Sequence, residues 1–74
     1  MPELPHLSGD DIVGVLHILG FEIARRRGSH VILRKGGKGC VVPMHREVAV
    51  GTLKSVMKQA GITAEEFIAA HKIK

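Results

Sequence analysis

The chain has 74 residues, of which 45% are hydrophobic and 24% charged, a balance that is ordinary for a globular protein and excludes a disordered chain. This length predicts one small domain that covers residues 1–74. Eleven Lys and Arg against seven Asp and Glu give a net charge of +4, which favours an anionic partner without distinguishing nucleic acid from an acidic protein.

The cysteine content and the first residues bear on the compartment. Cys40 is the single cysteine, which excludes an internal disulfide and fits a reducing environment. Residues 1–6 lack the basic and apolar regions of a signal peptide. No apolar run reaches the length needed to cross a bilayer. We therefore expect a cytoplasmic protein with no membrane partner.

A helix is predicted after an extended segment, residues 1–7. Ser8 can cap its N-terminus, and Asp10 and Asp11 suit the positive end of the helix dipole. Gly20 supplies the stop, because glycine tolerates the left-handed conformation of a C-terminal cap. The apolar residues recur at i, i+3, i+4 and i+7, the spacing of one helix face: Ile12, Val15, Leu16 and Leu19.

A β-hairpin is predicted next, with residues 21–27 as its first strand and residues 30–34 in its second. Side chains alternate along a strand, so His30, Ile32 and Arg34 should face away from the core. The residues expected to face the core are Phe21, Ile23, Val31 and Leu33.

The loop length of this hairpin decides its register. A two-residue Gly28-Ser29 loop would pair Ile23 with Arg34 and put the two apolar sets on opposite faces. A three-residue loop, residues 27–29, pairs Ile23 with Leu33 and Arg26 with His30. Because burial fixes register, we favour the longer loop, with Gly28 or Ser29 at a positive φ.

The remaining elements are a third strand and two helices. Residues 36–39 form a second tight connection, and residues 40–43 a short strand whose proline marks its end or an open edge. After a loop over residues 44–49, a helix begins near residue 51 and ends at Gly61. A capping box from Thr63 to Glu66 opens a last short helix. Helix, three strands and two helices predict an α+β fold, a three-stranded antiparallel sheet with helices on one face. The predicted core is Ile12, Val15, Leu16, Leu19, Phe21, Ile23, Val31, Leu33, Val42, Leu53, Val56, Met57 and Phe67.

His30 is the candidate catalytic residue, because it follows the turn on the sheet face expected to be free of helices. In the favoured register Arg26 lies opposite His30, and Arg34 shares that face. Nearby positive charge disfavours the imidazolium form, so a neutral ring could accept a proton. The alternative is that a histidine beside a turn only hydrogen-bonds to the hairpin backbone.

Basic residues gather around this hairpin, with six cations between residues 25 and 38. A charged sheet edge that resists aggregation is one explanation, but one or two charges usually suffice for that. The clustering therefore favours phosphate binding. The candidate phosphate ligands are Arg26, Arg34, Lys35 and Lys38, together with Lys54 and Lys58 on the outer face of the second helix.

Two other kinds of site are not favoured. The remaining histidines have no metal-ligand spacing with one another or with Cys40, so we expect no metal site and no cofactor. The two aromatic residues, Phe21 and Phe67, are expected in the core. Recognition of single strands by base stacking calls for exposed aromatic side chains, so their absence favours contacts to a nucleic-acid backbone.

A series of short segments then resembles a known family. The resemblance covers nearly the whole chain and rests on segments in a specific order, namely Ser8-Gly9, Leu19-Gly20-Phe21, Arg25-Arg26-Arg27-Gly28-Ser29-His30, Val42-Pro43-Met44-His45, Gly51-Thr52-Leu53 and Lys58-Gln59-Ala60-Gly61-Ile62. The chain resembles the HicA toxins. This implies an α-β-β-β-α fold like the double-stranded-RNA-binding domain, a metal-independent ribonuclease that cuts messenger RNA, and a HicB antitoxin as partner. The family's catalytic histidine corresponds to His30, whereas His45 matches a frequent family position without an assigned duty.

Two functions follow from these residues. In the first, His30 takes the proton from a ribose 2′-OH, which attacks the adjacent phosphorus, while Arg26, Arg34 and Lys38 offset the developing negative charge. In the second, the same fold and cations form an RNA-binding module without catalysis. A module that binds an acidic antitoxin is compatible with the first function.

Overall fold

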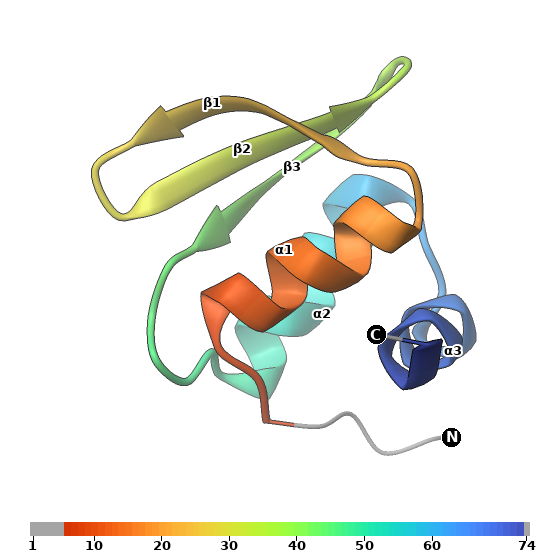
Figure 1. Cartoon of the computed structure of the whole chain (residues 1–74). Helices are drawn as coiled ribbons and strands as arrows, with labels where there is room; N and C mark the ends of the chain where they lie inside the picture. Colours follow the sequence, from red (N-terminus) through yellow and green to blue (C-terminus); the bar gives the residue numbers. More distant parts are fainter. Residues whose placement is uncertain (1–5, 74) are drawn as a thin grey trace.

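The computed structural model describes residues 6–73 and contains a three-stranded sheet with helices. The elements in chain order are α1 (Gly9–Ile18), β1 (Glu22–Arg27), β2 (His30–Lys35), β3 (Lys38–Pro43), α2 (Val50–Ala60) and α3 (Ala64–Ile73). The sheet is antiparallel in the order β1-β2-β3, and the helices lie on one side of it (Figure 1). The predicted α+β fold, like that of the double-stranded-RNA-binding domain, is confirmed. Of the extended segment expected at residues 1–7, the part before residue 6 lies outside the described residues.

Both ends of α1 are where the sequence predicts them. Ser8 Oγ accepts a hydrogen bond from the Asp11 backbone N–H at 3.1 Å, and the Ser8 N–H donates to Asp11 Oδ2 at 3.3 Å. This reciprocal pair is a capping box, which satisfies backbone donors that the first helical turn leaves unpaired. The chain leaves the helix through Gly20 at φ +99°, a conformation that costs glycine little.

A second capping box opens α3. The Glu66 N–H donates to Thr63 Oγ1 at 3.0 Å, and the Thr63 N–H donates to Glu66 Oε1 at 2.8 Å. This backbone hydrogen bond from Thr63 holds the pKa of the Glu66 carboxyl below its usual value. α3 then continues to Ile73, so the prediction of a short last helix is wrong: it has 10 residues.

The core lies between the sheet and the helices. β2 and β3 contribute side chains to it, α1 and α2 pack against β3, and α3 packs against α1. Twelve of the thirteen predicted core residues are buried or packed against the core, and Ile23 is the one that is not. The core residues that the predicted list omits are Leu7, Cys40, Val48, Ala60 and Ala70.

β1 departs from the predicted burial. All of its residues are exposed, and Ile23 keeps 50% of its surface although Leu33, directly opposite, is fully buried. The strand lies at the edge of the sheet, where the helical layer no longer covers it (Figure 1). Pairing with a buried residue therefore does not bury Ile23, because burial also needs a helix below.

The hairpin contains both of the strand pairings that the sequence allowed, one next to the turn and the other further from it. Next to the turn, Arg27 pairs with His30 and Arg26 with Val31, as a two-residue Gly28-Ser29 loop requires. Beyond a register shift between Ile23 and Arg25, Ile23 pairs with Leu33. Ala24 is thus the extra residue of a β-bulge, which moves the far half of β1 by one position. The predicted pairing of Arg26 with His30 is wrong, because the two-residue loop pairs Arg27 with His30 instead.

The end of β3 meets the beginning of α1 at close range. A Cβ built on Gly9 would lie 2.5 Å from Pro43 O and 2.7 Å from Met44 Cα, so only glycine fits there. The Gly9 N–H donates to His45 O at 2.9 Å, and the Met44 N–H donates to Ser29 O at 2.6 Å.

β3 itself starts at Lys38, two residues earlier than predicted, because the second turn needs only residues 36 and 37.

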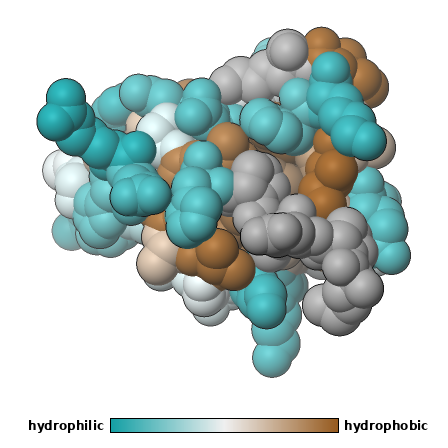
Figure 2. All heavy atoms as spheres, turned by 90° about the horizontal axis from the view of Figure 1, so that it is seen from below, coloured by the Kyte–Doolittle hydropathy of each residue, from teal (hydrophilic) through white to brown (hydrophobic). Residues whose placement is uncertain are grey.

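The side below the helices carries hydrophobic patches among hydrophilic side chains (Figure 2). Ile18 and Ile73 are the most exposed large apolar residues of the helices, at 40% and 76%. No helix between residues 6 and 73 combines the length and the hydrophobicity that crossing a membrane requires.

A substitution at Leu53 tests whether this face of α2 is buried in the core. Its side chain is 1% exposed, so Leu53→Ala should lower the free energy of unfolding by about 2–5 kcal/mol, the usual range for truncating a buried leucine. Lys54→Ala, at the exposed neighbouring position, is the control and should change it by less than about 0.5 kcal/mol. Urea titration followed by circular dichroism gives both values, and equal effects of the two substitutions would contradict the assignment.

Candidate functional site

The sheet has one face that no helix covers, which we call the open face. Strand pairing defines its members, because directly paired residues share a face. Arg27 pairs with His30 and Arg25 with Ile32, while Ile32 also pairs with Val41. The open face therefore carries Glu22, Arg25, Arg27, His30, Ile32, Arg34, Gly39, Val41 and Pro43.

His30 begins β2 on this face and is exposed. Among residues 6–73, no hydrogen bond or ion pair involves its ring. This argues against the alternative in which His30 serves to hold the hairpin backbone. The position of the ring is instead fixed by the strand, since His30 pairs with Arg27 on one side and with Pro43 on the other.

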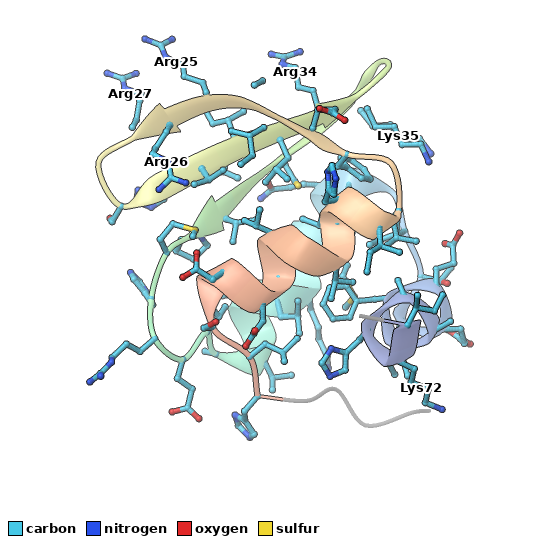
Figure 3. All side chains as sticks on the ribbon, viewed as in Figure 1. Arg25, Arg26, Arg27, Arg34, Lys35 and Lys72 are labelled. Atoms are coloured by element: carbon cyan, nitrogen blue, oxygen red, sulfur yellow. The ribbon has the colours of Figure 1, made fainter. Side chains whose placement is uncertain are left out.

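The arginines that accompany His30 differ from those expected. Arg25, Arg27 and Arg34 extend from the open side of the sheet, whereas Arg26 lies on its other side (Figure 3). The expectation that Arg26 shares a face with His30 is therefore wrong, because the two-residue turn pairs Arg27, not Arg26, with His30. Within the described chain, none of the three open-face guanidinium groups has an ion pair. They are free to meet an external anion.

Arg34 shares the open face with His30 but not its immediate surroundings. It lies four residues further along β2, which corresponds to about 13 Å at the rise of a strand. Arg27, directly opposite His30, is much nearer. One phosphate at His30 can therefore be contacted by Arg27, while Arg34 reaches a more distant part of an extended ligand.

Lys35 and Lys38 lie at the end of the sheet away from His30, and both have contacts within the fold. Lys35 Nζ donates to Leu19 O at 2.7 Å, and it lies 5.9 Å from the centroid of the Phe21 ring. The Lys38 side chain passes Gly61, and its charge helps to lower the pKa of Glu66. The structure thus does not bring these two predicted phosphate ligands to His30.

Lys54 and Lys58 are exposed on α2, as predicted. α2 lies on the covered side of the sheet, so neither residue joins the open face (Figure 1). The predicted set of cations therefore divides into separate groups. Of that set, Arg34 alone shares the open face with His30.

The loop after β3 brings a second histidine near the turn. His45 is exposed, and it lies two residues beyond Pro43, the partner of His30 in the sheet. The hydrogen bonds from Met44 N to Ser29 O and from Gly9 N to His45 O hold this loop between the turn and α1. Within residues 6–73, no group of three His, Cys, Asp or Glu side chains is arranged to hold a metal ion.

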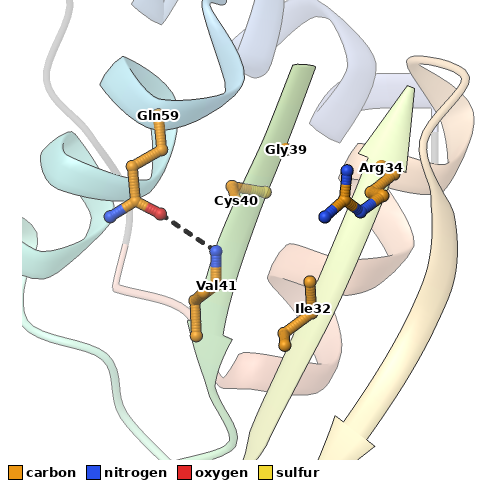
Figure 4. Close-up of a pocket in the computed structure, with 6 residues that line it drawn as sticks. All are labelled: Ile32, Arg34, Gly39, Cys40, Val41 and Gln59. Carbon is orange, nitrogen blue, oxygen red and sulfur yellow. Dashed lines mark hydrogen bonds between the residues drawn. The ribbon is translucent and has the colours of Figure 1, made fainter. Parts of the chain in front are cut away.

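A hollow of about 330 Å³ opens on the sheet further along β2 (Figure 4). Ile32, Cys40 and Val41 form its apolar part, and Gly39, which also lines it, has no side chain. Arg34, paired with Gly39, lies on one side, and Gln59 of α2 lies beyond the edge of β3. Gln59 Oε1 accepts a hydrogen bond from the Val41 N–H at 3.0 Å, which satisfies a donor at this edge.

Sequence reasoning missed several residues of this face. Arg25 and Arg27 belong to the basic run, but an odd loop length assigns them to the wrong side. The signal that identifies them is the Gly28-Ser29 pair itself, with glycine first, since Gly28 has φ +55° and this favours a two-residue turn. Gly39 and Gln59 carry no local signal, because their role depends on which elements lie together.

Most of the chain matches a known protein family. The sequence model described as "HicA toxin of bacterial toxin-antitoxin" matches residues 9–62, from the start of α1 to just beyond α2. This segment includes His30, Arg27 and the whole open face. No curated protein matches the chain.

The pH dependence of stability tests whether Cys40 is buried on the covered side of the sheet. Cys40 is 3% exposed, and burial raises the pKa of its thiol to about 11 from an ordinary value of 9.0. The unfolded chain therefore releases this proton at lower pH than the folded one, so stability should fall as pH rises from 9 to about 11. The loss should reach about 1–3 kcal/mol.

The measurement is urea unfolding of the wild type and of Cys40→Ala at several pH values. Other groups titrate in both proteins, so the difference between the two curves isolates the thiol. Parallel curves would contradict the burial of Cys40.

Proposed function

Because the chain belongs to the HicA toxin family and is thus the toxin of a toxin–antitoxin system, we propose that it is an endoribonuclease that cuts messenger RNA. His30 supports this proposal above all, since it is exposed on the open face, directly opposite Arg27, with its ring free of partners among the described residues. The family also implies an antitoxin partner. We propose that this partner is of the HicB type, and that the toxin acts in the cytoplasm, where its substrate is.

The proposed reaction uses the RNA's own 2′-hydroxyl as nucleophile. Neutral His30 accepts the 2′-OH proton while the oxygen attacks the adjacent phosphorus. The O2′–P bond forms and the P–O5′ bond breaks, which leaves a 2′,3′-cyclic phosphate and a 5′-hydroxyl. The leaving O5′ takes a proton from an acid to which we assign no residue. General base catalysis of this kind contributes about 10²–10⁴-fold.

The negative charge that grows on the phosphoryl oxygens needs a fixed cation nearby. Arg27 suits this role because it pairs with His30 across the two strands. Its guanidinium can donate two parallel hydrogen bonds to phosphate oxygens. Arg25 and Arg34 would hold neighbouring phosphates or nucleotides along the open face, so we propose Arg27 where the sequence favoured Arg26 and Lys38.

His30→Ala should slow RNA cleavage by at least about a hundredfold and leave folding nearly unchanged, since an exposed strand end contributes little packing. The measurement is cleavage of a defined RNA in the presence of a chelator, with circular dichroism as the folding control. His45→Ala is the matched comparison, because it removes an exposed histidine from the adjoining loop.

Undiminished cutting by His30→Ala would remove His30 from the mechanism, and loss of activity in His45→Ala alone would transfer the role to His45. If the wild type binds RNA without cutting it, with or without added divalent metal, the protein is an RNA-binding module. A chelator-sensitive activity would replace this mechanism by a metal-assisted one.

Arg26 and Arg27 form a matched pair for testing the face that RNA contacts. They are neighbours with the same charge on opposite sides of β1, so Arg27→Ala should weaken RNA binding more than Arg26→Ala. Because a phosphate contact carries no base information, the loss should be similar for unrelated sequences. The slope of log affinity against log salt should also decrease by about one for Arg27→Ala.

Fluorescence anisotropy with the non-cleaving His30→Ala background gives both quantities. Equal losses for the two arginines would mean that β1 attracts RNA through its total charge only. A larger loss for Arg26→Ala would move the binding surface to the covered side.

A further inference from the structure

We propose that the hollow on the open face seats one unstacked nucleobase of a single-stranded RNA, a few nucleotides from the phosphate that His30 attacks. This inference deepens the proposed function and rests on it. It adds a substrate class, single-stranded rather than duplex RNA, and a set of residues that contact a base: Ile32, Arg34, Gly39 and Val41.

The hollow has a volume of about 330 Å³ and is lined by Ile32, Arg34, Gly39, Cys40, Val41 and Gln59. Gly39, which pairs with Arg34 in the sheet, adds no side chain to it. This volume is at the lower end of the range of small-ligand sites, roughly 300–1,000 Å³. It therefore suits a single planar ring system better than a larger ligand.

The chemistry of the walls suits a base. Val41 keeps 39% of its surface exposed and Ile32 is half-buried, so together they offer an apolar surface to a ring face. Arg34 points across β2 toward the hollow (Figure 4). Its guanidinium plane can stack on a base or donate hydrogen bonds to base edges, as arginine does in many RNA complexes. Exposed aromatic side chains are therefore not required for stacking here, contrary to what the sequence suggested.

The position of the hollow ties it to the proposed reaction centre. Ile32 and Arg34 follow His30 on the same face of β2, at about 7 Å and 13 Å along the strand. A few nucleotides of single strand cover this distance. Arg25 and Arg27 line the same path from β1, which gives the backbone of such a strand its counter-charges.

Duplex RNA cannot use this hollow. Its bases are paired and stacked, and their edges lie within grooves, so no ring can enter a hollow on a sheet. A base in a single strand, loop or bulge can swing out at lower cost. The geometry therefore selects unpaired RNA.

The first experiment is an abasic scan of an RNA that the wild type cuts at one mapped bond. One nucleotide at a time is replaced by its abasic form, and binding to His30→Ala is measured by fluorescence anisotropy. One position, a few nucleotides from the cut, should weaken binding by about 5- to 100-fold, the loss that removal of one base stack causes. The same RNA annealed to its complement should compete poorly.

The second experiment fills the hollow. Gly39→Val adds a side chain there, and its Cβ would have ordinary contact with the nearest atoms, at 3.4 Å from Leu33 O and 3.7 Å from Arg34 Cγ. Gly37→Val is the matched control, because nothing lies within 4 Å of a Cβ at that turn position. Gly39→Val should remove the sensitivity to the abasic position, and Gly37→Val should retain it.

A third variant tests the hollow independently, in case Gly39→Val does not fold. Arg34→Lys keeps the charge and loses the planar guanidinium, so it should reduce the abasic effect with little change in the salt dependence of binding. Arg27→Lys is its control on the same face and should leave the abasic effect intact.

The outcomes separate this inference from the proposed function. A flat abasic profile alongside cleavage that depends on His30 overturns the base site and leaves the ribonuclease standing. If the wild type binds RNA without cutting it, the comparison of Gly39→Val with Gly37→Val still decides the base site. If Gly39→Val weakens antitoxin binding and leaves RNA binding unchanged, the hollow belongs to a protein interface and the inference is wrong.

Discussion

The structure depends on covering one face of a small sheet and leaving the other free. β2 shows this in consecutive residues, since Val31 and Leu33 are fully buried against the helices while His30 and Arg34 are exposed on the reverse side. Burial of the apolar side chains stabilises the domain and fixes the strand register. The positions of the open-face residues are then determined by a core that they do not touch, which is how a rigid scaffold can carry exposed chemical groups.

The bulge at Ala24 reconciles two demands on the same hairpin. The Gly28-Ser29 turn requires one register, and the pairing of Ile23 with Leu33 requires another. One extra residue lets both exist: the turn places Arg25 and Arg27 on the face of His30, and the bulge restores the pairing of Ile23 with Leu33. A basic run that looks uniform in the sequence is thereby divided between the two sides of a strand.

The sequence predicted most of the fold because the signals were local. Both capping boxes, the glycines that end α1 and α2, and the apolar stripes each lie within a few residues. His30 was also identified correctly as an open-face residue, from strand alternation alone. Ile23, Arg26 and Lys35 were misplaced because their surroundings depend on distant elements: the lateral extent of the helical layer, a bulge, and the C-terminal end of α1. No periodicity within β1 or β2 encodes those contacts.

The hydrogen bond from Val41 N–H to Gln59 has a consequence for how this sheet can grow. Another chain lengthens a sheet by matching the outward backbone groups of an edge strand. Along that border of β3, Gln59 already occupies the Val41 donor, and Pro43, two positions on, has none. The opposite border, β1, is bent by its bulge and carries positive charge. Self-association through strand addition is thus opposed at both borders of the sheet.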